Sequence, residues 1–256
     1  MNVGIMGCGA IASCITDFIL EGKIDVNVTY YYDLNDDNAA ILANKIGAKV
    51  AHTLDELIEN TDLILESAAQ VAVKNSVPKI LENGVSVLIM SVGALMDKSL
   101  RDHLYQLAKE NNAKIYLPTG AITGIDTVQA AQLGEITSIS LTTRKPPVSL
   151  DVDLEEGEEK VLFEGKASEA VKLFPKNINV SSTLSLASGI DVDVKIIADS
   201  KIKQNTHEIH LKGTFGELVT ITSNNSSSNN PKTSALAAYS AASLLNKLNK
   251  TIQIGS

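Results

Sequence analysis

Short apolar runs and helical patterns alternate along the first half of the chain. The helical spacing of apolar residues occupies residues 11–20, 38–46, 55–58, 71–81 and 100–110. Apolar runs suited to buried strands lie between them, at residues 3–6, 26–32, 63–65, 85–90 and 114–117. Strands that alternate with helices in this way predict a parallel sheet covered by helices on both faces.

The pattern changes near residue 120. Residues 136–143 alternate apolar and hydroxyl side chains, which is typical of a strand with one wet face. Two helical stretches, 169–174 and 180–187, come before consecutive strands at 192–198, 206–212 and 218–222. This order predicts an antiparallel or mixed sheet in a separate, smaller α+β domain. A polar loop at 223–230 then leads to Asn230-Pro231, a good start for a last helix through Leu248.

Composition narrows the class of protein. The net charge of −8 argues against polynucleotide binding, which rests on a basic surface. The two cysteines, Cys8 and Cys14, form no CxxC pair or Cys/His cluster, so we expect no metal site and no disulfide framework. No apolar run reaches the roughly 20 residues of a membrane helix, and no basic leader precedes the first apolar run. We therefore expect a cytoplasmic protein that binds neither nucleic acid nor membranes.

A glycine motif, Gly7-Cys8-Gly9-Ala10-Ile11-Ala12, joins the first predicted strand to the first helix. Gly7 permits a tight turn, Gly9 lets the backbone approach a pyrophosphate, and the small Ala12 allows close packing of helix on strand. The phosphates would lie at the helix N-terminus, beside Ala10 and Ile11. The motif and its context predict a Rossmann doubly wound parallel sheet over residues 1–118, completed by the C-terminal helix 231–256, with residues 119–230 as the substrate domain.

Asp33 ends the second strand, where a carboxylate can accept hydrogen bonds from the ribose hydroxyls of a dinucleotide. It would also repel a 2′-phosphate, and no arginine follows it, so NAD is favoured while NADP stays possible. The alternative is an ordinary turn followed by a solvated carboxylate. Two later loops, with Ser67, Ala68 and Gln70 after the third strand and Ser91 and Gly93 after the fourth, are candidate nicotinamide contacts or simple loop packing.

His207 is the candidate acid/base. Strand alternation places it on one face with Ile209 and Leu211, while His210 faces the other way. An inward histidine is a satisfied core residue or a catalyst, and the residues alone leave both open.

Cationic side chains that could hold an anionic substrate are few. Arg101 lies in an amphipathic helix and is expected to be solvated, whereas Arg144-Lys145 ends a strand before two prolines. Lys232, Thr233 and Ser234 are expected in the first turn of the last helix, where backbone N–H groups can also bind a carboxylate. Surface solvation is the alternative for both lysines.

Several blocks of the chain are similar to the L-aspartate dehydrogenase family. They occupy residues 66–73, 90–95, 120–126, 143–147, 163–165, 173–180, 205–209 (Asn-Thr-His-Glu-Ile) and 230–234 (Asn-Pro-Lys-Thr-Ser). The resemblance implies that His207 is catalytic and that Ala121 and Asn177 contact NAD. It also implies a homodimer formed by the second domain. Asn205, in the same block as His207, is a candidate substrate contact.

The implied reaction is NAD(P)-dependent oxidation of L-aspartate to iminoaspartate, which hydrolyses to oxaloacetate and ammonia. In de novo NAD biosynthesis, iminoaspartate would be handed to quinolinate synthase. A dihydrodipicolinate-reductase-like or sugar-dehydrogenase-like enzyme is an alternative that explains the 205–209 block less well. A non-catalytic NAD-binding sensor is another, although a sensor needs no acid/base.

Overall fold

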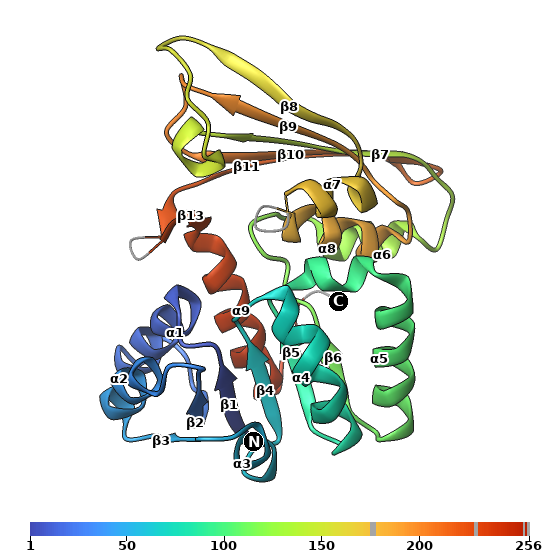
Figure 1. The fold of residues 1–256 in the computed structure, drawn as a ribbon. Helices are drawn as coiled ribbons and strands as arrows, with labels where there is room; N and C mark the ends of the chain where they lie inside the picture. Colours follow the sequence, from blue (N-terminus) through green and yellow to red (C-terminus); the bar gives the residue numbers. More distant parts are fainter. Residues whose placement is uncertain (175–177, 228–229, 253, 255–256) are drawn as a thin grey trace. The chain divides into compact units, whose positions relative to one another are not determined.

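The computed structural model describes residues 1–174, 178–227, 230–252 and 254. The chain forms two compact units. The first comprises Met1–Pro118 together with the last helix from Ala238, and the second comprises Thr119–Ala237. Each unit is built around a sheet of its own (Figure 1).

The sheet of the first unit is entirely parallel, as the alternating pattern predicts. Its strands lie in the order β3-β2-β1-β4-β5-β6. They are β1 (Asn2–Met6), β2 (Asn27–Tyr32), β3 (Lys49–Val50), β4 (Leu63–Glu66), β5 (Ser86–Ile89) and β6 (Ile115–Tyr116). The short strand β3 was not predicted. The chain reverses direction across the sheet between β1 and β4, which is where a doubly wound sheet binds its ligand.

Helices cover both faces of this sheet. They are α1 (Ala10–Leu20), α2 (Asp36–Ile46), α3 (Leu54–Glu59), α4 (Gln70–Glu82), the 3-10 turn η1 (Val92–Met96), α5 (Lys98–Glu110) and α9 (Ala235–Leu248). Helix α1 packs with α2, and α4 packs with α5. Right-handed crossovers in opposite directions from the centre place these two pairs on opposite faces.

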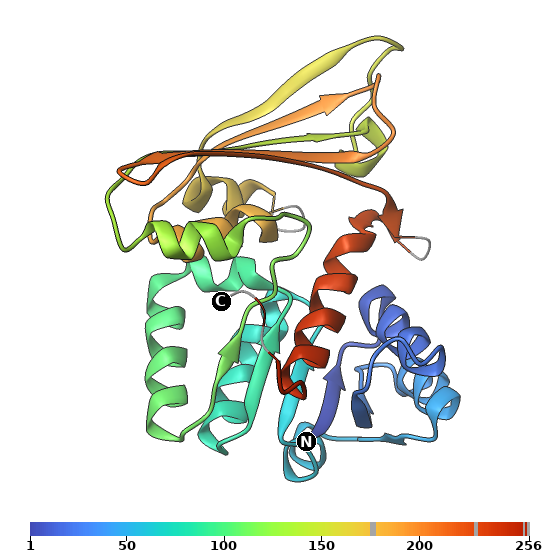
Figure 2. The same cartoon turned by 180° about the vertical axis from the view of Figure 1, so that it is seen from behind.

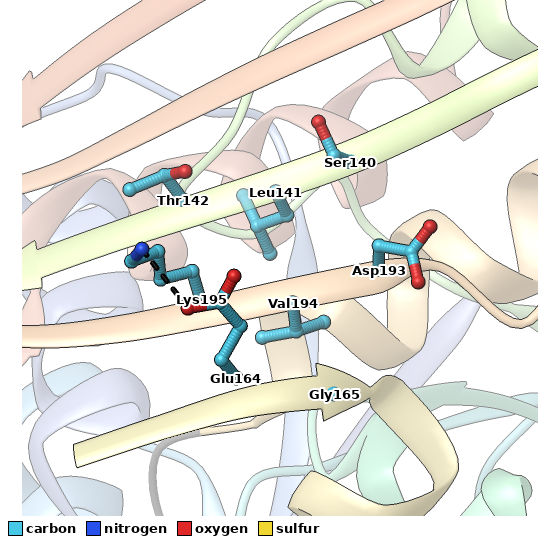
Figure 3. A pocket seen from close by; sticks show the side chains of 8 residues that line it. All are labelled: Ser140, Leu141, Thr142, Glu164, Gly165, Asp193, Val194 and Lys195. Atoms are coloured by element: carbon cyan, nitrogen blue, oxygen red, sulfur yellow. Dashed lines mark ion pairs between the residues drawn. The ribbon is translucent and has the colours of Figure 1, made fainter. Parts of the chain in front are cut away.

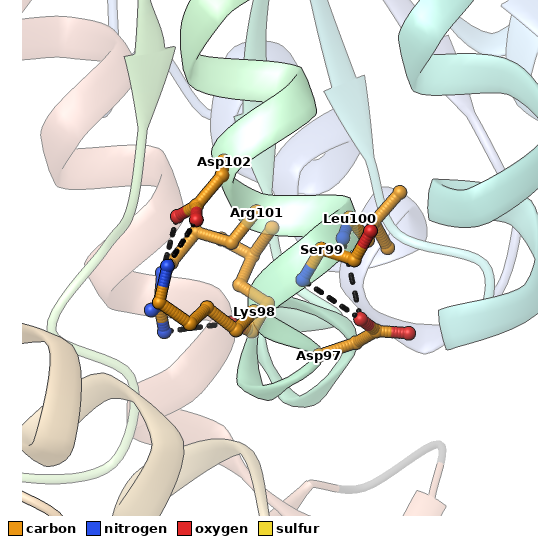
Figure 4. A network of polar contacts seen from close by, with 7 residues as sticks. Asp97, Lys98, Ser99, Leu100, Arg101 and Asp102 are labelled. Carbon is orange, nitrogen blue, oxygen red and sulfur yellow. Dashed lines mark hydrogen bonds and ion pairs between the residues drawn. The ribbon is translucent and has the colours of Figure 1, made fainter.

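Helix α5 shows how side chains fix a helix start (Figure 4). The Asp97 carboxylate accepts from the backbone N–H groups of Ser99 and Leu100, at 3.1 and 3.2 Å, and so caps the first turn. Lys98 forms an ion pair with Asp102 one turn later. Arg101 differs from the solvated side chain expected, because it is only 24% exposed and its Nη1 donates to the Leu95 carbonyl at 3.3 Å.

The second unit has a mixed sheet in the order β11-β10-β7-β9-β8. Its strands are β7 (Ile136–Lys145), β8 (Glu159–Lys166), β9 (Asp193–Asp199), β10 (Asn205–Gly213) and β11 (Gly216–Asn224). Strands β7 and β9 are parallel and the other pairs antiparallel. This confirms the mixed sheet expected from the sequence, although β8 was not predicted because acidic residues precede it.

Helices line one face of this second sheet in the described part of the chain (Figures 1 and 2). They are α6 (Ile125–Ala131), the 3-10 turn η2 (Pro147–Leu150), α7 (Ala167–Leu173) and α8 (Asn179–Ser188). Inward side chains such as Leu141 and Ile209 are buried, at 1% exposure each. On the outer face Val219 and Ile221 remain exposed.

The end of the second unit corrects one prediction. Asn230-Pro231 does not begin a helix, because residues Asn230–Ser234 form strand β13, paired with β12 (Ser226–Ser227). The last helix begins at Ala235. Strand β11 also extends to Asn224, into the stretch expected to be a polar loop. Local capping preferences were outweighed here by strand pairing.

Candidate active site

The glycine turn has the backbone geometry of an anion-binding loop. Gly7 follows β1 with φ of +94°, and a Cβ there would lie 2.7 Å from the Ala68 backbone. Gly9 precedes α1, and a Cβ there would meet nothing within 4 Å. No side chain caps α1 and no acidic residue lies in its first turn. The N–H groups beside Ala10 and Ile11 therefore fit a pyrophosphate, with open space at Gly9.

Asp33 borders this turn directly. Its Oδ2 accepts from the Cys8 backbone N–H at 2.7 Å, and its Oδ1 accepts from the Asn35 N–H at 2.9 Å. The carboxylate is half-buried and keeps lone pairs that ribose hydroxyls can use. Burial, with a smaller contribution from Asp33, raises the pKa of the Cys8 thiol to about 12, so this cysteine stays protonated.

The loops after β4 and β5 are joined by Glu66, which the sequence did not single out. This side chain is fully buried at the end of β4. Its carboxylate accepts from the Ala68 N–H, the Ser91 N–H and the Ser91 hydroxyl, at 2.9, 2.9 and 2.8 Å. Burial raises the pKa of Glu66, and the hydrogen bonds from Ser91 and Ala68 oppose that rise. The sequence signal that could have identified Glu66 is an acidic residue directly after the apolar run 63–65.

The predicted cofactor residues of the first unit gather at one edge of its sheet. Ser67 donates through its hydroxyl to the Gly7 carbonyl at 2.7 Å. Gln70 begins α4, and Gly93 lies buried in η1. The structure thus brings the turns after β1, β2, β4 and β5 together at the carboxyl ends of the strands, where such sheets bind ligands.

His207 lies on the helix-covered face of β10, as alternation predicts, and is 2% exposed. Its Nδ1 is 2.9 Å from the Oγ1 of Thr143, its partner residue on β7. His210 points to the other face, where it contacts Glu208. The Thr143 contact orients the imidazole and leaves Nε2 as its second functional atom.

Lys145 shares this face and is buried, with 6% exposure. Burial lowers the pKa of its ammonium to about 8. Burial, and secondarily the charge of Lys145, lowers the pKa of His207 to about 3. The free protein therefore holds a neutral His207 at physiological pH. Its pKa lies well below the near-neutral value that suits general acid–base catalysis.

Asn205 completes this group. It is fully buried, and its Nδ2 donates to the Ser234 hydroxyl at 3.2 Å. Within the described residues its Oδ1 has no hydrogen-bond partner. On the neighbouring strand, Asn224 Nδ2 and Thr222 Oγ1 both donate to the Ala121 carbonyl, at 2.9 and 3.0 Å. Ala121 is thus held beside β11, the strand that pairs with the His207 strand.

Arg144 is turned away from His207. It follows Thr143 on β7 and so points to the opposite face of the sheet. Its Nη1 forms ion pairs with Glu159 at 2.7 Å and Asp199 at 3.3 Å. The structure therefore groups Lys145, Asn205 and Ser234 with His207, but not Arg144.

Three further candidate residues are not part of this group in the structure. Lys232 and Thr233 lie in strand β13, not in the first turn of the last helix. Asn177 lies outside the described residues. The hollow in Figure 3 is a separate feature on the outer face of the second sheet, where Lys195 pairs with Glu164 at 2.9 Å.

Over residues 1–174, 178–227, 230–252 and 254, no group of three or more His, Cys, Asp or Glu side chains could hold a metal ion. The helices found there are all too short or too polar to cross a membrane.

The doubly wound sheet with its glycine turn, and the second unit with a buried histidine and lysine, define a two-unit nicotinamide-dependent oxidoreductase. Family profiles described as "Homoserine dehydrogenase, NAD binding domain" and "Aspartate dehydrogenase, C-terminal" match residues 7–118 and 126–248. The L-aspartate dehydrogenases of Methanothermobacter thermautotrophicus and Methanococcus maripaludis strain C6 are 49% and 47% identical, each over 100% of this chain and 99% or 100% of their own. The chain belongs to the aspartate dehydrogenase family, which confirms the resemblance found in its sequence.

A solved structure agrees with this assignment. The aspartate dehydrogenase of Thermotoga maritima superposes with a TM-score of 0.82 at 29% identity, over 100% of this chain and 99% of that one. Biliverdin reductase from Synechocystis, at 15% identity and a TM-score of 0.53, shares the fold alone.

Proposed function

We propose that the chain catalyses the NAD-dependent oxidation of L-aspartate to iminoaspartate, which water converts to oxaloacetate and ammonia. One observation carries this proposal within the family: a neutral imidazole, His207, is held by Thr143 on the same buried face as Lys145 and Asn205. This set supplies a base for the substrate nitrogen, a cation for a substrate carboxylate, and an amide that can form a hydrogen bond with the substrate.

The chemistry begins with a proton. The α-carbon of an ammonium releases hydride poorly, so the nitrogen must first lose a proton, which His207 Nε2 accepts. NAD, which the glycine turn and Asp33 of the first unit would hold, would supply the acceptor for the hydride that leaves the α-carbon, while the nitrogen lone pair forms the C=N bond. His207 can then assist the water that adds to the imine, and the tetrahedral adduct breaks its C–N bond to give the ketone and ammonia.

The substrate itself supplies the basicity that His207 lacks in the free protein. A neighbouring negative charge favours the imidazolium form. We therefore expect two bound carboxylates to raise the pKa of His207 above its value in the free protein and to keep the Lys145 ammonium charged. The low pKa of the free protein is thus compatible with a base that forms when the substrate binds.

Lys145 is the cation we assign to a substrate carboxylate, because it is buried on the His207 face. Ser234, whose hydroxyl contacts Asn205, borders the same group. Lys232 and Thr233 of β13 remain candidates for the second carboxylate. Arg144 would act indirectly, through its ion pairs with Glu159 and Asp199.

The decisive assay follows NADH absorbance on mixing the protein with oxaloacetate, with and without ammonium. We expect oxidation that requires ammonium. Ammonium-independent oxidation would indicate a hydroxy-acid dehydrogenase. Bound NADH without turnover under either condition would favour the sensor alternative.

The His207→Ala variant tests the proposed base. We expect kcat to fall by at least about a hundredfold, in the range that general acid–base catalysis contributes. His210→Ala is the matched control, because His210 lies on the same strand with its side chain on the opposite face. Comparable losses in both variants would remove His207 from the mechanism.

We further propose that the protein works in the cytoplasm, supplies iminoaspartate to quinolinate synthase in NAD biosynthesis, and acts as a homodimer. Support for the dimer comes from the outer face of the second sheet, where Val219 and Ile221 are 48% and 61% exposed. Sedimentation velocity measures the dimer, and a monomer at micromolar concentration would contradict it.

A further inference from the structure

We propose that Asn205 Oδ1 accepts a hydrogen bond from the reacting nitrogen of the substrate, and that this contact makes the site select an imine over a ketone. The proposal rests on the proposed function, because it assigns one atom of that site to one atom of its substrate. Such a contact would let the site discriminate against oxaloacetate, the ketone to which its product hydrolyses.

In the structure, the Asn205 amide turns its nitrogen toward Ser234. Nδ2 donates to the Ser234 hydroxyl at 3.2 Å, so the oxygen is the end of the amide left over. Oδ1 is buried and has no hydrogen-bond partner within the described residues. A buried acceptor in this condition is unfavourable unless a ligand brings a donor to it.

The nearest amide on the neighbouring strand does not supply that donor. Asn224, the register partner of Asn205 on β11, already donates its Nδ2 to the Ala121 carbonyl at 2.9 Å. Thr222, two residues earlier on the same face, donates to the same carbonyl at 3.0 Å.

Asn205 is also in the right place. It precedes His207 by two residues on β10, so the two side chains share a face of the strand. The ladder between β10 and β7 pairs Thr206 with Arg144, which puts Asn205 and Lys145 next to each other at its end. A substrate whose carboxylate contacts Lys145 and whose nitrogen contacts His207 therefore brings its N–H groups to this amide.

The selection follows from donors and acceptors. In the reductive direction the α-carbon receives hydride from NADH, the π electrons of the C=N bond move to nitrogen, and nitrogen takes the proton held by His207. An iminium keeps an N–H that can donate to Oδ1 throughout this step. The corresponding ketone places an oxygen lone pair against Oδ1 instead. A site built around such a hydrogen bond rejects an analogue that lacks it.

The test compares two rates of NADH oxidation with oxaloacetate, one with ammonium, giving aspartate, and one without, giving malate. For Asn205→Leu, which keeps the volume but removes the acceptor, we expect the ratio of these rates to fall at least about tenfold. The ammonium-independent rate should hold or rise. Asn205→Asp, which keeps an acceptor oxygen, should stay closer to the wild-type ratio.

A proportional fall of both rates in Asn205→Leu would overturn the proposal, as would an unchanged ratio, because either result describes a merely structural residue. If Asn205→Leu does not fold, Asn205→Ala gives the same comparison with less bulk. Competitive inhibition of L-aspartate oxidation by oxaloacetate and by succinate, measured without added ammonium, gives relative binding affinities that do not depend on kcat. We expect the variant to gain affinity for oxaloacetate relative to succinate. Failure of the proposed function is distinguishable, since the wild-type protein would then show no ammonium-dependent rate.

Discussion

At the scale of single residues, the role proposed for His207 depends on its contact with Thr143. The Thr143 hydroxyl is 2.9 Å from Nδ1 inside the protein. If Nδ1–H donates to this oxygen, Nε2 carries the lone pair needed to remove a proton from the substrate. Thr143 is therefore a positioning residue, and strand alternation on β7 was the signal that could have found it.

Thr143→Val keeps the shape of the side chain and removes the hydroxyl. We expect kcat to fall about tenfold with KM for NAD unchanged, because the ring loses its preferred tautomer and orientation. Nitrogen-15 chemical shifts of His207 report the tautomer directly. Thr143→Ser should recover most of the rate; equal damage in the serine and valine variants would refute the positioning role.

Asp33 is the residue to which we assign a preference for NAD over NADP. Replacing it with serine should raise KM for NAD and narrow the ratio of kcat/KM for NAD over NADP by at least about tenfold. The reason is that a carboxylate binds ribose hydroxyls and repels a 2′-phosphate. The measurement is steady-state kinetics with each cofactor. An unchanged ratio would assign Asp33 only to holding the Cys8 N–H.

At the scale of elements, the turn between β1 and α1 allows a matched pair of substitutions. Gly7→Ala forces φ of +94° on a residue with a Cβ and places that Cβ 2.7 Å from Ala68. We expect a loss of about 1–2 kcal/mol or more in stability. Gly9→Ala meets open space, so the fold should be unaffected while NADH affinity falls.

Thermal unfolding and NADH fluorescence titration separate the two effects. Weak NADH binding by a Gly9→Ala protein of normal stability would locate the pyrophosphate at this turn. Normal NADH binding by that variant would place the pyrophosphate elsewhere.

The elements that the sequence predicted well are those in which a single local pattern acts. Runs such as residues 85–90 are apolar because helices cover both faces of the strand, so β5 was found. Strand β8 was missed because it lies at the sheet edge, with exposed charges along it. Asn230 and Pro231 are residues typical of a helix start, so the last helix was predicted to begin there. In the structure these residues belong to strand β13, which pairs with β12.

The site was predictable to a similar extent. Alternation placed His207 inward and His210 outward, and both placements are confirmed. Strand alternation on β7 likewise places the side chains of Lys145 and Arg144 on opposite faces of the sheet. What the sequence could not give are contacts across strands, such as Glu66 with Ser91, because these depend on register and on loop conformations that no local pattern encodes.

At the scale of the whole molecule, His207 should make folding stability depend on pH. Its folded pKa of about 3 lies below its ordinary value of 6.5, so the unfolded chain binds the extra proton between these pH values. Stability therefore falls as the pH drops through 6.5. From this group alone the loss between pH 7.5 and 5 is about 2 kcal/mol.

Urea unfolding of the wild-type protein and of His207→Gln at both pH values measures this dependence. The glutamine cannot titrate, so the difference in unfolding free energy between the two proteins should change by about 2 kcal/mol on acidification. Contributions from Glu66 and other acids cancel in that comparison. A pH-independent difference would mean that His207 is protonated as easily in the folded protein as in the unfolded chain.

The first unit is assembled from two distant parts of the chain, since α9 joins residues that precede it by more than a hundred positions. Helix α9 buries Ala241 and Leu245, and its Tyr239 ring lies 5.1 Å from that of Phe18. During synthesis on the ribosome, the first unit is therefore complete only after the last helix has emerged. The sheet of the second unit, by contrast, lies wholly before that helix in the chain, so it can form before the first unit is complete.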